Sequence, residues 1–177
     1  MWRRLKIVGM ATQATKVKAR PDGYHTVTPW VISRNAGELI DFMKAAFAAE
    51  ELGRVDVGGG RIGHAEVRIG DSVLMTFDAS PEWPDTPAFI RLYVEDADAA
   101  FERAVVAGAI AVTRVAEHVF GDRVGRVRDP QGNVWWLQTH VRDVAPEAMQ
   151  HPSPAQAETM QDAMSSLDRE MCGRVHR

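Results

Sequence analysis

The chain of 177 residues carries 21 Lys and Arg against 24 Asp and Glu, and 45% of its residues are hydrophobic. This length suits one globular unit or two small modules that share a core, and the apolar fraction excludes wholesale disorder. The single Cys excludes an internal disulfide and a cysteine zinc site and fits a reducing, cytoplasmic setting. No apolar run reaches the about 20 residues of a membrane helix, and the net charge of −3 gives no reason to expect nucleic acid as a partner.

The chain begins with a basic segment. Residues 1–21 hold six basic residues and no acidic one. The apolar run from Ile7 to Ala11 is too short for a secretory signal. We expect residues 1–22 to form a disordered basic tail, because chain ends are often unordered.

The first predicted module spans 23–79. Thr26 to Ser33 is rich in β-branched residues and indicates a strand. Asn35 can then cap a helix, because the apolar residues that follow fall on one helical face. Strands are predicted at 52–57, 61–69 and 72–78, since glycine-rich turns at 58–60 and 70–71 separate them.

Three prolines in residues 80–87 predict a stiff linker before the second module, which spans 88–146. A strand is predicted at 88–94, and Asp96 can cap a helix that runs through Val106 and stops at Gly108. Strands follow near 111–116, 123–128 and 133–140, with a turn at 129–132 before the last.

Residues 147–177 predict a helical extension. Ser153 and Pro154 suit the first positions of a helix. An apolar stripe then recurs every three or four residues, at Met160, Met164, Leu167 and Met171. We expect this stripe to dock on the body of the protein or on a second subunit.

A weak internal repeat connects the two modules. The segment RIGH at 61–64 reappears as RVGR at 123–126, and GDS at 70–72 corresponds to GNV at 132–134, both at an offset of 62. Each copy of about 60 residues reads as a strand, a helix and three strands. The predicted fold class is therefore α+β: two βαβββ modules that form a cupped mixed sheet with helices on the outside, plus a C-terminal helix.

Several segments together resemble one family. They are GYHTVTP at 23–29, GHAEVRIGDS at 63–72, LYVED at 92–96, and GDR and DPQG within 121–132. They resemble the glyoxalase/bleomycin-resistance/extradiol-dioxygenase superfamily, also called vicinal oxygen chelate, and most closely its glyoxalase-like bacterial branch, largely uncharacterised. The resemblance covers about residues 23–146. It implies paired βαβββ modules, a small-molecule cavity in the cup and a homodimer.

In metal-dependent members, the resemblance implies four ligands from the first and last strands of the two modules. Those positions fall here on Thr28, Leu74, Phe89 and Trp136, and a slip of two residues gives Thr26, Thr76, Arg91 and Gln138. Neither set contains a His or a carboxylate, so neither makes a divalent-metal site. We therefore predict that the usual metal is absent and that there is no cofactor. An atypical site from other residues stays open.

Strand alternation assigns a helix-facing side and a cup-facing side to each sheet. Val73, Met75 and Phe77 are predicted on the helix-facing side, and Ile62 and Leu74 in the cup. A concave surface of aromatic groups with a few convergent polar groups is typical of a small-molecule pocket. The predicted ligand-binding residues of the cup are Thr28, Trp30, Thr76, Phe89, Arg91, Tyr93, Trp136 and Gln138.

His64 and Glu66 are the candidate catalytic pair, because residues two apart on a strand share a face. They either act as a general acid and base or satisfy each other in a polar network. Arg91 suits an anionic or carbonyl-bearing ligand. Arg123, Arg126 and Arg128 alternate along one strand and either bind an anion or form a solvated or intersubunit edge.

These observations favour a metal-free, glyoxalase-like protein that binds a small, partly aromatic or apolar molecule and forms a homodimer, with neither nucleic acid nor a membrane as partner. The alternative is a lyase, isomerase or dioxygenase-type enzyme that uses His64 and Glu66 or a relocated metal site. Because this fold hosts many chemistries, the residues of the site must decide between the two.

Overall fold

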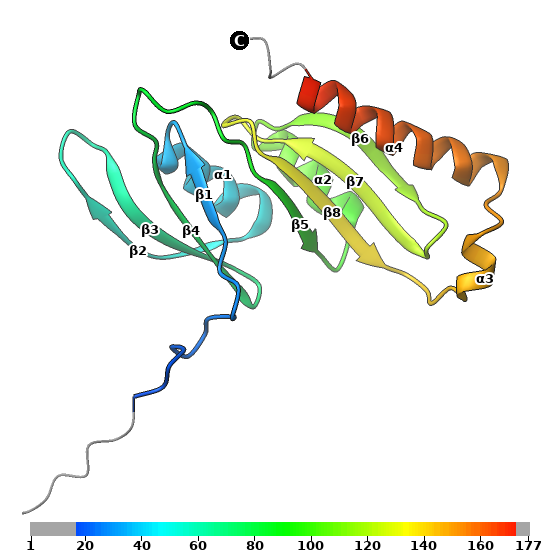
Figure 1. Ribbon diagram of the computed structural model, residues 1–177, viewed down its shortest axis with the longest axis horizontal. Coiled ribbons are helices and arrows are strands. Elements are labelled where there is room, and N and C mark those ends of the chain that lie inside the picture. Colours follow the sequence, from blue (N-terminus) through cyan, green and yellow to red (C-terminus); the bar gives the residue numbers. More distant parts are fainter. Residues whose placement is uncertain (1–16, 173–177) are drawn as a thin grey trace, which may run out of the picture.

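The computed structural model describes residues 17–172, so most of the predicted basic tail, residues 1–16, lies outside the described part. The first module consists of β1 (Trp30–Ser33), α1 (Ala36–Phe47), β2 (Glu50–Asp56), β3 (Ile62–Ile69) and β4 (Ser72–Asp78). Its strands form a sheet in the order β1-β4-β3-β2, in which β1 runs parallel to β4 (Figure 1).

The second module repeats this topology. It consists of β5 (Phe89–Tyr93), α2 (Ala97–Val106), β6 (Ile110–Glu117), β7 (Asp122–Arg128) and β8 (Val134–His140). Its sheet has the order β5-β8-β7-β6, with β5 parallel to β8. A short helix α3 (Pro146–Met149) and a long helix α4 (Pro154–Cys172) follow. The predicted α+β fold of two βαβββ modules and a C-terminal helix is confirmed.

The predicted caps explain where the helices begin. The Asn35 side chain accepts a hydrogen bond from the Glu38 backbone N–H at 3.1 Å, and Asp96 accepts one from Ala99 at 3.0 Å. Ser153 caps α4 in the same way, through the Gln156 N–H at 3.3 Å. The first strand, however, begins at Trp30 and not at Thr26.

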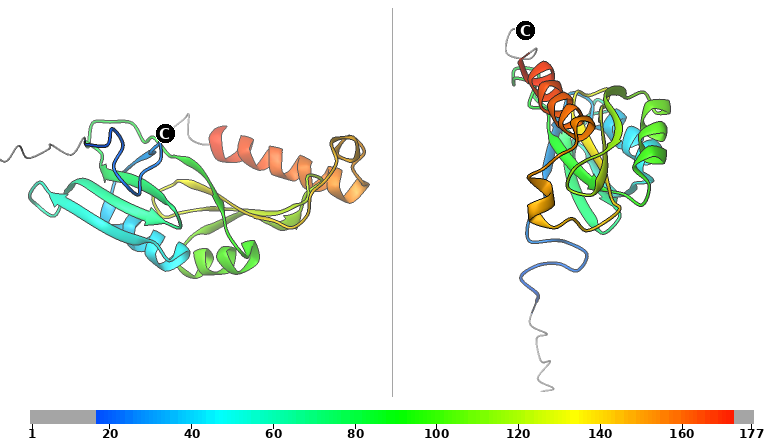
Figure 2. Two further views of the ribbon diagram at one scale, coloured as in Figure 1. Left: turned by 90° about the horizontal axis from the view of Figure 1, so that it is seen from below. Right: turned by 90° about the vertical axis from the view of Figure 1, so that its right-hand side faces the viewer.

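One hydrophobic core joins the modules. The helices α1 and α2 pack on the same side of the two sheets and contact each other (Figure 2). Trp135 of β8 is fully buried, with its ring centroid 4.9 Å from that of Phe47 and 6.4 Å from that of Phe42 on α1. A residue of the second module therefore completes the core beneath the helix of the first.

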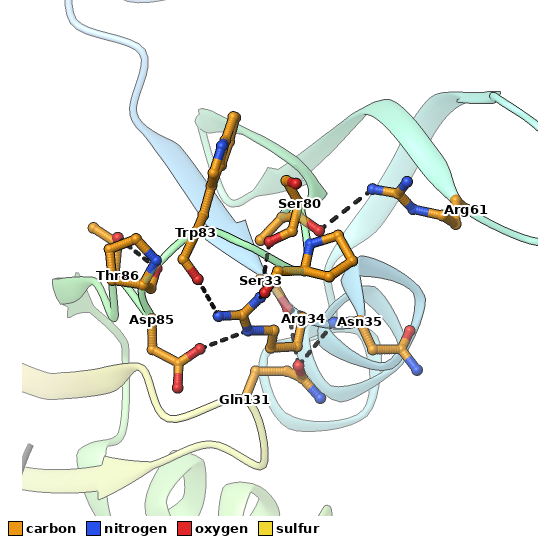
Figure 3. A network of polar contacts seen from close by, with 12 residues as sticks. Ser33, Arg34, Asn35, Arg61, Ser80, Trp83, Asp85, Thr86 and Gln131 are labelled. Atoms are coloured by element: carbon orange, nitrogen blue, oxygen red, sulfur yellow. Dashed lines mark hydrogen bonds and ion pairs between the residues drawn. The ribbon is translucent and has the colours of Figure 1, made fainter. Parts of the chain in front are cut away.

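Polar contacts reinforce this connection. The Gln131 side chain, in the turn between β7 and β8, accepts hydrogen bonds from the Ser33 hydroxyl and the Asn35 backbone N–H, each at 3.0 Å (Figure 3). Arg34 holds the proline-rich linker: its guanidinium pairs with Asp85 at 2.6 Å and donates to the carbonyl of Ser80 at 2.9 Å. The linker is thus fastened to the first module.

Helix α4 lies on the side of the second sheet opposite α1 and α2 (Figure 2). It contacts β6 and buries Ala163 and Ser166. The β6 side of the second sheet is therefore covered on both faces, whereas β5 at the other edge is not covered by α4. No helix within residues 17–172 combines the length and apolar character needed to cross a membrane.

Candidate functional site

We call the side of each sheet opposite α1 and α2 the cup face. Strand pairing corrects part of the predicted cup. Thr76 and Leu74 pair with Ala65 and Val67, which are fully buried residues of the helix-side core, and so share their face. The Thr76 hydroxyl donates to the carbonyl of Val31 at 2.7 Å. Thr76 and Leu74 therefore lie on the helix side, not in the cup.

The reason for this error is the length of the hairpin turns. Ile69 pairs with Ser72 across a two-residue turn, whereas Arg128 pairs with Val134 across a longer one. The two modules must therefore be compared through the parallel strand pairs β1–β4 and β5–β8. Met75 stands opposite Trp30 in the first pair, and Trp136 stands opposite Arg91 in the second. Met75, and not Leu74, is the counterpart of Trp136.

Three other residues also lie on a different face from the predicted one, each for its own reason. Phe77 lies on the cup face, because its ring contacts that of Trp30 at 5.4 Å. Ile62 is buried in the core, because the pairing of β2 with β3 shifts between His64 and Ile62. Arg123 forms an ion pair with Asp98 of α2 at 2.8 Å and so does not share a face with Arg126.

A polar cluster lies on the cup face of the first sheet. His64 Nε2 is 3.3 Å from Glu66, and the Tyr24 hydroxyl also donates a hydrogen bond to Glu66. The His64 ring lies 5.3 Å from that of Trp30. Sequence reasoning missed Tyr24, since it precedes the first strand and no periodicity marks it.

Hydrogen bonding sets the ionisation of this cluster. The bond from Tyr24 lowers the pKa of Glu66, and the bond from His64 adds to the effect against the opposing effect of burial. The hydrogen bond between Tyr24 and Glu66 also raises the pKa of Tyr24. Glu66 is thus held as a carboxylate acceptor, which disfavours a role as general acid and agrees with a polar network.

An aromatic and cationic cluster lies on the cup face of the second sheet. Trp136 on β8 stands between Arg91 on β5 and Arg126 on β7. The two guanidinium carbons lie 4.5 Å and 4.2 Å from the centroid of the indole ring. The ring of Phe89 lies 6.0 Å from the indole in an edge-on arrangement. Arg126 is buried beneath α4, and sequence reasoning did not predict it as part of this cluster.

A polar network continues from this cluster. Gln138 donates through its amide Nε2 to Asp122 and lies 3.4 Å from the Tyr93 hydroxyl. Asp122 is buried and also contacts His140 Nδ1 at 2.5 Å. A hydrogen-bonded chain thus runs from the buried Gln138 through Asp122 to His140 at the exposed end of β8.

The structure brings five of the predicted ligand-binding residues together on the second cup face, whereas on the first cup face only Trp30 remains of them; the five are Phe89, Arg91, Tyr93, Trp136 and Gln138. Thr28 lies outside both sheets: it precedes β1, and its hydroxyl donates to the carbonyl of His25 at 3.2 Å. A cavity of about 530 Å³ lies between β6 and α4, and Thr113, His118, Asp162 and Ala163 contribute to its wall. A second, of about 620 Å³, lies between the modules and is lined in part by Arg91 and Tyr93.

Comparison with known families now decides the relationship. The model of the Glyoxalase/Bleomycin resistance protein/Dioxygenase superfamily matches residues 24–137, which include the first module and most of the second. The chain belongs to this superfamily. The predicted resemblance is thereby confirmed.

Relatives within the superfamily support the assignment. An uncharacterized protein of Mycobacterium bovis is 36% identical over 143 residues, which cover 75% of this chain and 94% of the relative. An uncharacterized protein of Mycobacterium tuberculosis has the same identity, over 84% of its length. The crystal structure of TioX from Micromonospora sp. ML1 shares the fold, with a TM-score of 0.57 and 24% identity over 65% of this chain and 98% of TioX.

The metal of some superfamily members does not fit the equivalent positions here. Strand pairing brings Trp30 and Met75 together on the first cup face and Arg91 and Trp136 on the second. None of these side chains offers a nitrogen or carboxylate ligand suited to a divalent cation. Within residues 17–172, no group of three or more His, Cys, Asp or Glu residues is arranged to hold a metal ion.

The pH response of His140 follows from its carboxylate partners. The bonds to Asp122 and Asp143 raise the pKa of His140 above 6.5. The resulting stabilisation is fully present below about pH 6.5, the pKa in the unfolded chain, and is lost as the pH rises through the folded-state pKa. We expect an NMR titration of His140 to give a midpoint above 6.5, which Asp122→Asn lowers. A midpoint at or below 6.5 in the unmodified protein would contradict this account.

Proposed function

We propose that this glyoxalase-superfamily protein binds a small, partly aromatic or apolar molecule on its cup face, without the divalent metal of some superfamily members. The observation that carries the proposal is the set of aromatic side chains that this face leaves accessible. Trp30, Phe89 and Tyr93 remain 49%, 43% and 66% exposed, although each belongs to a strand. Exposed aromatic surface beside fixed polar groups is typical of ligand sites.

The second sheet is the better supported half of this site. Trp136 is fixed between two guanidinium groups, and Phe89 stands edge-on beside it. Because the two guanidinium groups cover the faces of the indole ring, a planar ligand stacks on the exposed ring of Phe89 or lies against the edge of Trp136. Arg91, Tyr93 and Gln138 supply polar groups around it. The first sheet adds Trp30, His64 and Glu66 as a second surface.

A neutral aromatic probe tests the site. We expect 2-naphthol to quench the tryptophan fluorescence of the full chain, and Phe89→Ala and Trp136→Ala to weaken its binding by about tenfold each, since each removes an aromatic contact with the ligand. The matched control is Trp83→Ala, because Trp83 is an exposed indole of the linker. Equal affinity in all four proteins would overturn the assignment to the second sheet.

We further propose that the form of the protein that binds the ligand is a homodimer. Met160, Met164 and Met171 on α4 remain 40%, 65% and 41% exposed, and Ile110 on the edge strand β6 is 57% exposed. Apolar groups that a single chain leaves uncovered are suited to a subunit interface. Sedimentation of the same fluorescence samples measures the mass of the species that binds the probe, and a monomeric binding species would contradict the dimer.

A further inference from the structure

Three buried polar atoms on the second cup face have no hydrogen-bond partner among the described residues: Arg126 Nε, Trp136 Nε1 and Gln138 Oε1. Buried polar groups in proteins are nearly always paired, and leaving one unpaired costs about 1–3 kcal/mol. Three such atoms in one place therefore indicate a missing partner. Arg126 and Gln138 are only 1% and 2% exposed, so bulk water does not supply it.

The three atoms belong to one patch. Arg126 stands directly opposite Trp136 in the pairing of β7 with β8, and Gln138 is the next residue of β8 on the same face. Arg126 and Trp136 each offer an unused N–H, while Gln138 offers an unused carbonyl oxygen. The orientation of the Gln138 amide is determined by Asp122, because a carboxylate accepts only from the Nε2 side. A complementary ligand needs acceptor oxygens and a nearby donor.

The charge of Arg126 defines the acceptor. Arg128 on the same strand pairs with Glu170 of α4 at 3.0 Å, and Arg123 pairs with Asp98. The described hydrogen bonds of Arg126 instead go to the backbone carbonyl of Ala163 and, at 2.9 Å, to the Ser166 hydroxyl. The carboxylate of Asp162 on α4 is near enough to favour the Arg126 cation, but the direct hydrogen bonds of Arg126 go to neutral groups. A buried guanidinium with such partners is costly, and an anion in direct contact would relieve that cost. Arg91, on the other side of Trp136, adds a second positive charge.

A cavity is lined by neighbours of Arg126, although Arg126, Trp136 and Gln138 are not themselves part of its wall. The cavity of about 530 Å³ between β6 and α4 includes Thr113, the cross-strand neighbour of Arg126, and Ala163, whose carbonyl Arg126 contacts. Its wall also includes Asp162 and Glu158 of α4. These carboxylates repel an anionic group, and Asp162 is near enough to act on the charge of Arg126, so an anion is favoured only in direct contact with the guanidinium. The remainder of the ligand must be uncharged or carry hydrogen-bond donors.

We propose that the patch of Arg126, Trp136 and Gln138, closed over by α4, binds the carboxylate of a small aromatic hydroxy acid. The carboxylate oxygens accept the N–H groups of Arg126 and Trp136, because a planar two-oxygen anion matches the guanidinium. A ring hydroxyl donates to Gln138 Oε1. This assignment rests on the proposed function, in which a small molecule lies on the cup face, and it specifies the chemistry of that molecule.

Calorimetric titration of the full chain with 3-hydroxybenzoate and its neutral analogue 3-hydroxybenzamide tests the charge. We expect the acid to bind at least about tenfold more tightly than the amide, as a buried charge pair does. Arg126→Met should abolish this preference, whereas Arg123→Met, a change on the same strand, should preserve it. Circular dichroism confirms that each variant is folded.

Gln138→Leu provides a test that does not alter the arginine. We expect it to weaken 3-hydroxybenzoate several-fold and leave benzoate unchanged, because benzoate has no hydroxyl for Gln138 to bind. Equal binding of acid and amide, or unchanged acid binding by Arg126→Met, would overturn the anion site while the 2-naphthol result still stands. Absence of acid binding at about 10 mM has the same meaning and leaves internal water as the partner. Failure of 2-naphthol as well would remove the proposed function itself.

Discussion

Replacing Trp135 by Ala is expected to lower the free energy of unfolding by about 4 kcal/mol, because deletion of a fully buried indole leaves a cavity that the neighbouring side chains fill only in part. Trp135 is 0% exposed and packs against Phe42 and Phe47 of the other module. The change therefore weakens the contact between modules as well as the second module. Urea denaturation monitored by circular dichroism measures the effect.

The control for this prediction is Trp83→Ala. Trp83 is 49% exposed and contacts Phe77 at 6.1 Å, so its removal should cost less than about 1 kcal/mol. Equal effects of the two substitutions would mean that Trp135 does not hold the modules together. A broadened or biphasic transition in Trp135→Ala would show that the modules then unfold separately.

Asp129→Ala is expected to cost about 3 kcal/mol, because the Asp129 carboxylate accepts four hydrogen bonds while only 3% exposed. Its donors are the backbone N–H groups of Gln131 and Asn133, the Asn133 amide and the Trp135 indole N–H, at 2.8–2.9 Å. Removal of the carboxylate leaves buried donors without an acceptor. The same denaturation experiment measures the loss.

Asp129→Asn separates charge from geometry. It keeps the size of the side chain but faces donors with an amide NH₂, so it should also destabilise the protein, by about 2 kcal/mol. Asp168→Ala on the exposed side of α4 should stay within about 0.5 kcal/mol of the unmodified protein. A destabilisation by Asp129→Ala no larger than that of Asp168→Ala would show that the hydrogen bonds to the Asp129 carboxylate do not stabilise the turn.

The secondary structure was largely predictable because its signals are local. Asn35, Asp96 and Ser153 cap their helices through bonds to residues three positions ahead, and such contacts depend on sequence spacing alone. The start of the first strand was wrong because β-branched residues at 26–28 suit a strand but have no partner strand in the sheet. Propensity alone does not supply that partner.

The candidate site was predictable only in part. Alternation predicts the cup-face positions of Trp30, Phe89, Arg91 and Trp136, but the repeat offset depends on the turns and predicts the wrong side for Leu74 and Thr76. A slip of one residue reverses the face of every side chain in a strand. Long-range contacts decided the rest.

Helix α4 illustrates such a contact. The sequence predicted a helix with an apolar stripe that docks on the protein or on a second subunit. Within one chain, the structure buries two small residues, Ala163 and Ser166, against Arg126, while the methionines of the stripe stay partly exposed, and docking on a second subunit stays a prediction. Small side chains allow the helix backbone to approach a guanidinium, and hydrophobic periodicity does not report that requirement.

The contacts of Gln131 and Trp135 have a consequence for synthesis of the protein on the ribosome. Helix α1 receives part of its N-terminal hydrogen bonding from Gln131 and part of its apolar covering from Trp135, which lie about 90 residues later in the chain. Loop closure over that distance must precede these contacts. Helix α1 can pack on the sheet of its own module, but Phe42 and Phe47 lack their contact with Trp135 until the last hairpin emerges. The first module is therefore completed only together with the second.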